Sequence, residues 1–144
     1  MLIVEILRAK PGPVVTVPPD TTVRELLAML ARHGIGACVV SGDGRGVDGM
    51  VSERDVVRAL AARGPGVLDE PVSAICTVDV HTTTRQARTE ELMTVMTEKR
   101  FRHVPVVEDG VLVGIVSIGD VVKQRTSELE AESAAMSAYI SAGG

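Results

Sequence analysis

The chain carries one pair of polar residues twice, a Ser followed three positions later by an Asp: Ser52 with Asp55, and Ser117 with Asp120. A Ser that opens a helix with an acid three residues on is a capping box, in which each side chain accepts a hydrogen bond from the other residue's backbone N–H. This interpretation needs no ligand. Because Asp is ionised at neutral pH, each carboxylate could also accept hydrogen bonds from a bound molecule. The two interpretations are compatible, since a helix N-terminus that holds a ligand is still a capped helix.

Both pairs belong to a longer internal repeat. Residues 49–57 read GMVSERDVV and residues 114–122 read GIVSIGDVV, with Gly, Val, Ser, Asp, Val and Val in register. Farther upstream, residues 24–30 correspond to residues 90–96. A chain that repeats itself is expected to fold as similar units packed on one another.

Hydrophobic spacing predicts the same elements in each copy, in the order β-α-β-β-α. In the first copy we expect strands at 14–17, 37–40 and 46–51, and helices from about 23 and from Ser52 to about 63. In the second copy we expect strands at 78–82, 104–107 and 111–116, and helices over about 90–96 and from Ser117 to about 125. The first helix is expected to be capped by Asp20, Thr21 or Thr22.

The expected fold class is therefore α/β, with two β-α-β-β-α repeats packed by pseudo-two-fold symmetry into one module. We assign residues 8–64 to the first repeat, 72–126 to the second, and 127–144 to a C-terminal helix and loose tail. A half of this size buries too little apolar surface to be stable alone, so the halves should share a face. The cleft between them is the expected ligand site.

Composition narrows the possible functions. The net charge of -4 argues against general nucleic-acid binding, which calls for a basic face. The sequence shows neither a signal peptide nor an apolar run long enough for a membrane span. Cys38 and Cys76 have no paired spacing, which favours buried thiols and a cytoplasmic location.

The chain resembles the CBS-domain family, specifically proteins made of one CBS pair. The resemblance spans residues 2–125 and depends mainly on 49–55, 114–120 and the RHVPVV run at 102–107. It implies that Asp55 and Asp120 accept hydrogen bonds from the two hydroxyls of a ribose, each contributing about 1.5–3 kcal/mol. The implied ligand is an adenosine compound, AMP, ADP, ATP, NAD(H) or S-adenosylmethionine, bound for regulation rather than as a catalytic cofactor.

The resemblance also implies the remaining ligand contacts. The candidate ligand-binding residues are Val15, Thr16, Met50, Ser52, Arg54, Asp55, Thr77, His81, Thr82, Arg102, His103, Pro105, Ile115, Ser117 and Asp120. The basic pair Arg102 and His103 would meet phosphates, although basic residues at a strand edge also discourage unwanted strand pairing. Arg54 is either a phosphate contact or a solvated helix charge. The first repeat has Gly36 and Ala37 where the second has the basic pair, so the two sites should differ.

We expect no catalysis and no metal site, since neither a metal-ligand spacing nor a nucleophile motif is present. The rival hypothesis is a ligand-independent dimerisation or protein-interaction module. Proteins of this family commonly form homodimers, and a separate regulated partner is implied. The C-terminal stretch 127–140 predicts a helix with Leu129, Met136, Tyr139 and Ile140 on one side, either packed back on the body or forming a dimer contact.

Overall fold

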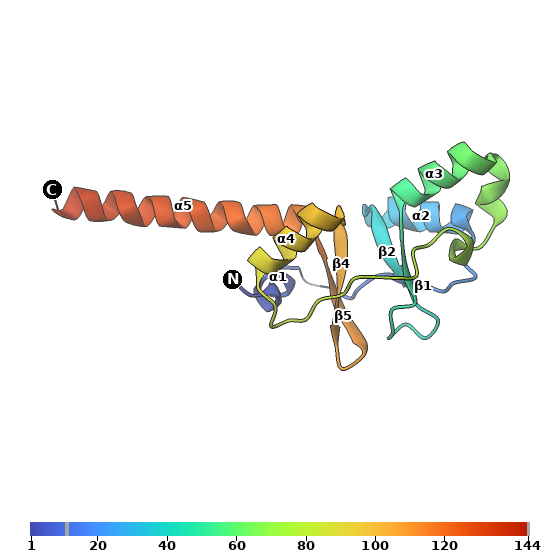
Figure 1. Ribbon diagram of the computed structural model, residues 1–144, viewed down its shortest axis with the longest axis horizontal. Coiled ribbons are helices and arrows are strands. Elements are labelled where there is room, and N and C mark those ends of the chain that lie inside the picture. The colour runs from blue at the N-terminus through green and yellow to red at the C-terminus, as the bar shows by residue number, and fades with distance from the viewer. Residues whose placement is uncertain (11, 144) are drawn as a thin grey trace.

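The computed structural model describes residues 1–10 and 12–143 (Figure 1). The first half consists of β1 (Thr16–Val17), α2 (Val23–His33), β2 (Ala37–Val40), β3 (Gly49–Ser52) and α3 (Glu53–Arg63). The second half consists of α4 (Thr89–Lys99), β4 (His103–Glu108), β5 (Val111–Ser117) and α5 (Ile118–Gly143). A short helix, α1 (Ile3–Arg8), precedes the first half, and two 3-10 turns, Pro65–Asp69 and Val72–Ala74, precede the second. The expected α/β fold of two similar halves is confirmed.

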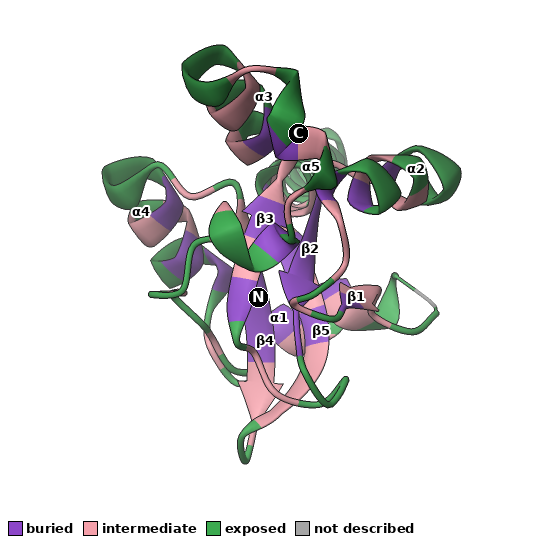
Figure 2. Cartoon of the chain, turned by 90° about the vertical axis from the view of Figure 1, so that its right-hand side faces the viewer, coloured by how far each residue is buried: buried purple, intermediate pink, exposed green. Residues whose placement is uncertain are grey.

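Each half has its own small sheet. In the first, β2 lies between β1, to which it is parallel, and β3, to which it is antiparallel. The second sheet pairs β4 with β5 as an antiparallel hairpin. Asp109 and Gly110 turn this hairpin, both with positive φ, as their Asp-Gly sequence predicts. Buried strands stand between helices whose outer sides are exposed (Figure 2).

The prediction of a strand at 78–82 is wrong. Val78 is 75% exposed, so no buried side chain holds this stretch against a sheet. A single parallel bridge between Thr83 and Val106 stands where the first half has β1. The first strand is also shorter than expected, at two residues. The third begins only at Gly49, because the Asp48 carboxylate accepts the backbone N–H of Gly42 at 2.6 Å and closes a loop there.

The first helices of the two halves begin at matching positions but are capped differently. Thr22 caps α2 in a reciprocal capping box with Glu25. The N-cap of α4 is Arg88, which makes no side-chain cap hydrogen bond. Instead, the buried Thr89 donates its backbone N–H to the carbonyl of Met1 at 2.9 Å. The N-terminus of the chain therefore supports α4.

The two halves exchange segments. Ile3 and Ile6 of α1 are buried in the core of the second half, among Leu92, Met96 and Val104. Reciprocally, the core of the first half takes in Val67 and Val72, from the linker that precedes the second half. Matching backbone bridges join Leu2 to Arg88 and Thr22 to Pro71. Each hydrophobic core is thus completed by chain from outside its own repeat, which couples the stabilities of the halves.

The C-terminal part of the chain differs from expectation. Residues 118–143 form one continuous helix, so the helices expected on either side of residue 126 are joined, and residues 141–143 are helical rather than a loose tail. Residue 144 lies outside the described residues. The outer part of α5 projects away from the body (Figure 1). Its four apolar side chains are exposed, from 49% for Leu129 to 78% for Tyr139, so the helix does not pack back on the body.

The segment exchange predicts that α1 stabilises the second half. Replacing the fully buried Ile3 by Ala should lower the free energy of unfolding by about 2–4 kcal/mol, measured by urea denaturation, because a cavity opens in that core. The matched control is Leu2→Ala, at a side chain 36% exposed, which should cost less than about 1 kcal/mol. Equal small losses for both variants would show that α1 contributes nothing to the core.

Candidate functional site

The first Ser-Asp pair is a reciprocal capping box at the start of α3. Asp55 Oδ2 accepts hydrogen bonds from the backbone N–H of Ser52 at 2.9 Å and from its hydroxyl at 3.1 Å. The Ser52 hydroxyl in turn accepts the backbone N–H of Asp55 at 3.3 Å. The capping interpretation is confirmed. These bonds, which involve Oδ2 and not Oδ1, hold the carboxylate in one orientation.

Asp55 also lines a large cavity between the halves. The cavity has a volume of about 1050 Å³, just above the range typical of small-molecule sites. Its walls come from the start of α3, from β2 and β3, from the linker before α4, from the α4–β4 connection and from the start of α5. The expected site residues that line it are Met50, Ser52, Arg54, Asp55, Thr77, His81, Arg102, His103 and Ser117. Capping and cavity lining therefore coexist at Asp55.

The linker reaches the cavity because it crosses closely over β3. Thr77 and Met50 exchange both of their backbone N–H···O hydrogen bonds, each at 2.9 Å. The crossing passes directly over Gly49, where a Cβ atom would lie 2.9 Å from the carbonyl oxygen of Thr77. A side chain at this position would push the linker away. The repeated Gly of the motif is thus what allows Thr77 into the cavity wall.

An aromatic pair forms another part of the wall. The rings of His81 and Phe101 are stacked, with centroids 5.9 Å apart and planes 24° from parallel. Nearby, burial of His103, aided by the positive charges of Lys10 and Arg102, lowers the pKa of its imidazole below the usual value. The neutral form of His103 is therefore favoured at neutral pH. Of the expected phosphate-binding pair, Arg102 is the residue that we expect to supply the positive charge.

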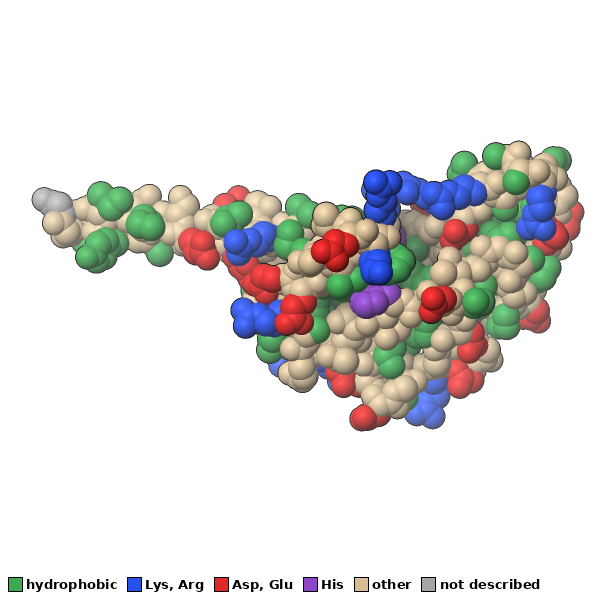
Figure 3. Space-filling model, viewed as in Figure 1, with side chains coloured by type: hydrophobic (Ala, Val, Ile, Leu, Met, Phe, Trp, Pro, Cys, Tyr) green, Lys and Arg blue, Asp and Glu red, His purple; other side chains and the backbone are tan. Residues whose placement is uncertain are grey.

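Three further cations line the cavity that we did not expect from the sequence: Arg58, Lys99 and Arg100. Arg58 lies four residues after Arg54 on α3, hence on the same helix face. Lys99 and Arg100 directly precede the Phe101-Arg102-His103 run. These spacings were the signals that could have identified them. Lys and Arg side chains gather at the junction of the two halves, above a His side chain (Figure 3).

The second Ser-Asp pair repeats the capping bonds but not the surroundings. Asp120 Oδ2 accepts the backbone N–H of Ser117 at 2.8 Å, as its counterpart does. The same oxygen also receives Lys10 Nζ at 2.8 Å in an ion pair. Burial alone would raise the pKa of the Asp120 carboxyl, but the hydrogen bonds from Lys10 and Ser117 outweigh it, and the pKa lies below its usual value. Asp120 thus has a cationic partner from the same chain, 110 residues away.

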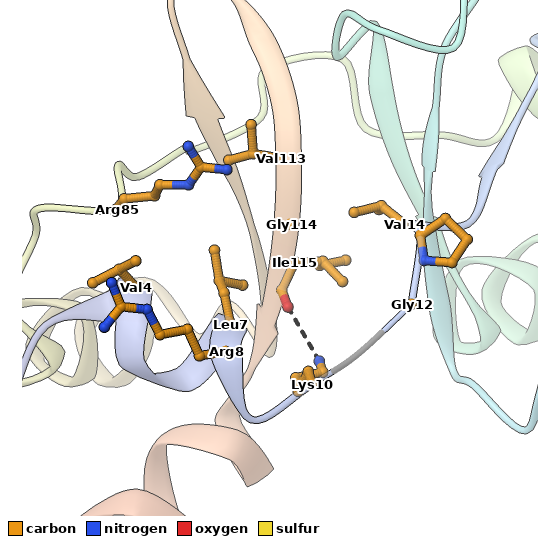
Figure 4. Close-up of a pocket in the computed structure, with 11 residues that line it drawn as sticks. Val4, Leu7, Arg8, Lys10, Gly12, Val14, Arg85, Val113, Gly114 and Ile115 are labelled. Carbon is orange, nitrogen blue, oxygen red and sulfur yellow. Dashed lines mark hydrogen bonds between the residues drawn. The ribbon is translucent and has the colours of Figure 1, made fainter.

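Lys10 also borders a second, smaller cavity of about 520 Å³ (Figure 4). Its ammonium donates to the carbonyl oxygen of Ile115 at 3.1 Å, on β5. Ile115 is an expected site residue that lines this cavity rather than the large one. Arg8 and Arg85 reach its border from α1 and from the loop before α4 (Figure 4). The two Asp residues are therefore set in different environments.

Asp120 and four other expected site residues lie outside the lining of both cavities. Thr16 pairs with Val39 in the first sheet, and Val15 directly precedes it, half-buried. Thr82 is exposed in the loop that replaces the expected strand. Pro105 is buried within β4. None of these four is in the wall beside Asp55.

The cysteines are poor nucleophiles. Burial raises the pKa of the Cys38 thiol to about 11, and burial also raises the pKa of Cys76. Thiolate is the reactive form, so both remain largely unreactive at neutral pH. In residues 1–10 and 12–143, no group of three or more His, Cys, Asp or Glu is placed to hold a metal ion. Among the helices that the structure describes, none combines the length and apolar character that crossing a membrane requires.

Comparison with known proteins identifies the repeats. A family model described as the CBS domain matches residues 5–62 and 72–126. The chain is 34% identical over 128 residues to the CBS domain-containing protein CBSX3, a mitochondrial protein of Arabidopsis thaliana. That stretch is 86% of this chain and spans 62% of the length of the Arabidopsis protein.

Solved structures show the same fold. A CBS-domain containing protein from Agrobacterium tumefaciens is 44% identical with a TM-score of 0.83, over 87% of this chain and 99% of that one. A CBS domain protein from Pyrobaculum aerophilum, solved in complex with AMP, is 32% identical with a TM-score of 0.78, over 90% of this chain and 97% of that one. With its two matched regions and this fold, the chain belongs to the CBS-domain family as a tandem CBS pair.

Proposed function

We propose that this CBS pair is a regulatory module that binds an adenosine-containing ligand in the large cavity and catalyses no reaction itself. The observation that carries the proposal is the position of Asp55, a carboxylate fixed by its capping bonds on the wall of a cavity of nucleotide size. The Pyrobaculum relative, solved with AMP, supports an adenosine compound as the ligand class. The candidates remain AMP, ADP, ATP, NAD(H) and S-adenosylmethionine.

Asp55 is suited to hold the ribose. Its Oδ2 already accepts two hydrogen bonds from Ser52. Within the described part of the chain, no cation forms an ion pair with this carboxylate. Oδ1, which takes part in none of these bonds, therefore offers an acceptor to a vicinal diol. Since the capping bonds already fix the side chain, binding costs little extra rotamer entropy.

The rest of the ligand follows from the wall around Asp55. The stacked rings of His81 and Phe101 offer an aromatic surface against which a purine can pack. Met50 and the Thr77 backbone supply apolar and polar contacts beside it. Arg102, exposed at the edge of the same cavity, is placed for phosphate. We assign His103 a hydrogen-bonding role, because its pKa is lowered.

The Asp120 half is proposed to be the weaker site. A ribose at Asp120 must displace Lys10 Nζ from both the carboxylate and the Ile115 carbonyl. Asp120 also lies outside the lining of both cavities, whereas Asp55 lines the large one. We therefore propose one ligand per chain, bound at Asp55.

Regulation would follow from the segment exchange. A ligand that fits one arrangement of the halves better favours that arrangement, and each half is completed by chain from the other's side. The output would pass to a separate protein partner. The free cysteines suit a reducing compartment such as the cytoplasm.

The second candidate function is self-association, and α5 is the observation that favours it. Residues 133–143 carry no charged side chain, yet this part of the helix exposes Met136, Tyr139 and Ile140. A second copy of the same helix could cover this face without placing like charges together, in a two-fold symmetric contact. We propose that the chain forms a homodimer through this part of α5, with or without ligand.

The ribose assignment predicts which Asp matters. In thermal-shift assays with AMP, ADP, ATP, NAD and S-adenosylmethionine, at least one compound should raise the melting temperature of the wild type. Asp55→Asn should weaken the binding of that compound about tenfold or more, because a charged hydrogen-bond acceptor becomes neutral. Asp120→Asn is the matched control and should leave the shift nearly unchanged. The assignment fails if the Asp120 variant loses binding and the Asp55 variant keeps it.

Removing Lys10 should free the second carboxylate. In calorimetric titrations, Lys10→Met should increase the number of ligands per chain from one to two. Above pH ~4, where Asp120 is ionised and paired with Lys10 in the wild type, the same variant should have a lower free energy of unfolding than the wild type. This difference should disappear at lower pH, once Asp120 is protonated in both the folded and the unfolded state. Two ligands bound to the wild type, or weaker binding at Asp55 in the variant, would contradict this role for Lys10.

The dimer proposal is tested by light scattering after size-exclusion chromatography. The wild type should have twice the chain mass of 15.2 kDa. The double variant Met136→Glu, Ile140→Glu should be a monomer, since the dimer contact would have to bury the two charges. The matched control places Glu at Ala134 and Ala138, on the opposite helix face, and should remain dimeric. A monomeric wild type would rule out self-association through α5.

A further inference from the structure

Positive charge is concentrated around the large cavity. The cationic side chains in its lining are Arg54, Arg58, Lys99, Arg100 and Arg102. They make up five of the 15 Lys and Arg of a chain whose net charge is -4. The lining also contains three carboxylates, Glu53, Asp55 and Asp79. The cavity is therefore locally positive in a negative protein.

The cations come from two elements. Arg54 and Arg58 lie one turn apart on α3, and the other three lie at the end of α4 and in the connection to β4. In the part of the chain that the structure describes, none of the five is held in an ion pair. Like charges around one cavity repel each other, and an anion bound between them relieves the repulsion.

Arg100 shows that this charge is kept at a conformational cost. It follows α4 in the left-handed region, with φ 59° and ψ 32°. At the corresponding position after α2, the first half has Gly34 with nearly the same angles, φ 63° and ψ 36°. Left-handed backbone is easy for Gly and strained for a side chain such as Arg. The second half thus has a strained cation where the first half shows that Gly fits.

A helix end alone does not explain Arg100. A cation in the last turn stabilises a helix through its dipole, and this accounts for Lys99. Arg100 is exposed, and within the described residues it has no ion-pair partner that would favour its retention. The feature that it shares with its neighbours is the cavity that they line.

We infer that the cavity selects adenosine compounds with a polyphosphate chain, ATP and ADP, over AMP and the cationic S-adenosylmethionine, and that Arg100 is a specificity-determining residue for the outer phosphates. The inference rests on the proposed binding of an adenosine ligand at Asp55. The two groups of cations would hold the phosphate chain between them. Gly34, Gly36 and Ala37 provide no such charge in the first half.

Calorimetric titration of the wild type with ATP, ADP, AMP and S-adenosylmethionine tests the selectivity. ATP should bind roughly tenfold more tightly than AMP, because several exposed charge pairs each add a small contribution. S-adenosylmethionine should bind most weakly. The preference for ATP should shrink as NaCl is raised, since salt screens exposed charges. Equal affinities for ATP and AMP would overturn the inference but leave the proposed function standing, whereas failure of every compound to bind would overturn the proposed function.

Two substitutions separate the charge of Arg100 from its strain. Arg100→Gly should raise the melting temperature by roughly 2–4 °C and reduce the ATP preference to about threefold. Arg100→Gln should reduce the preference equally without the gain in stability. Arg32→Gln, at an exposed Arg of α2 outside the cavity lining, is the control and should change neither quantity. Retention of the full ATP preference in both Arg100 variants would show that Arg100 does not contact phosphate.

Discussion

The hydrogen bonds between Ser52 and Asp55 are the constraint on which the proposed site depends. They satisfy backbone groups at the start of α3, which a helix requires whether or not it binds a ligand. The same bonds orient a carboxylate toward the cavity between the halves. The same bonds that cap the helix therefore also fix the carboxylate that we propose as the acceptor for the ribose. Gly49 completes the arrangement by letting the linker and Thr77 approach.

Repetition of the motif does not produce two equivalent sites. Asp120 keeps the capping bond to Ser117 but has Lys10 as its partner, whereas Asp55 faces a cavity lined with cations that make no ion pair among the described residues. Some cations of the large cavity come from the second half, where Arg100 and Arg102 occupy the positions that correspond to Gly34 and Gly36 of the first half. The two Asp residues of the repeated motif thus lie in different electrostatic surroundings.

Much of the fold could be predicted from the sequence, because apolar spacing and the repeated motif report local structure. Strands at 37–40 and 111–116 and the caps at Ser52 and Thr22 follow from their immediate neighbours. The prediction of a strand at 78–82 was wrong because the two valines of this stretch are not buried in either core. The Lys10 ion pair and the exchange of α1 could not be predicted, since they join residues far apart in the chain.

The most direct test of the Asp55 site is a crystal structure of the protein with ATP. We expect the ribose 2′ and 3′ hydroxyls to lie within hydrogen-bonding distance of the Asp55 carboxylate, with the phosphates between α3 and the end of α4. A nucleotide bound only at Asp120, with Lys10 displaced, or one whose ribose lies away from both carboxylates, would contradict this expectation.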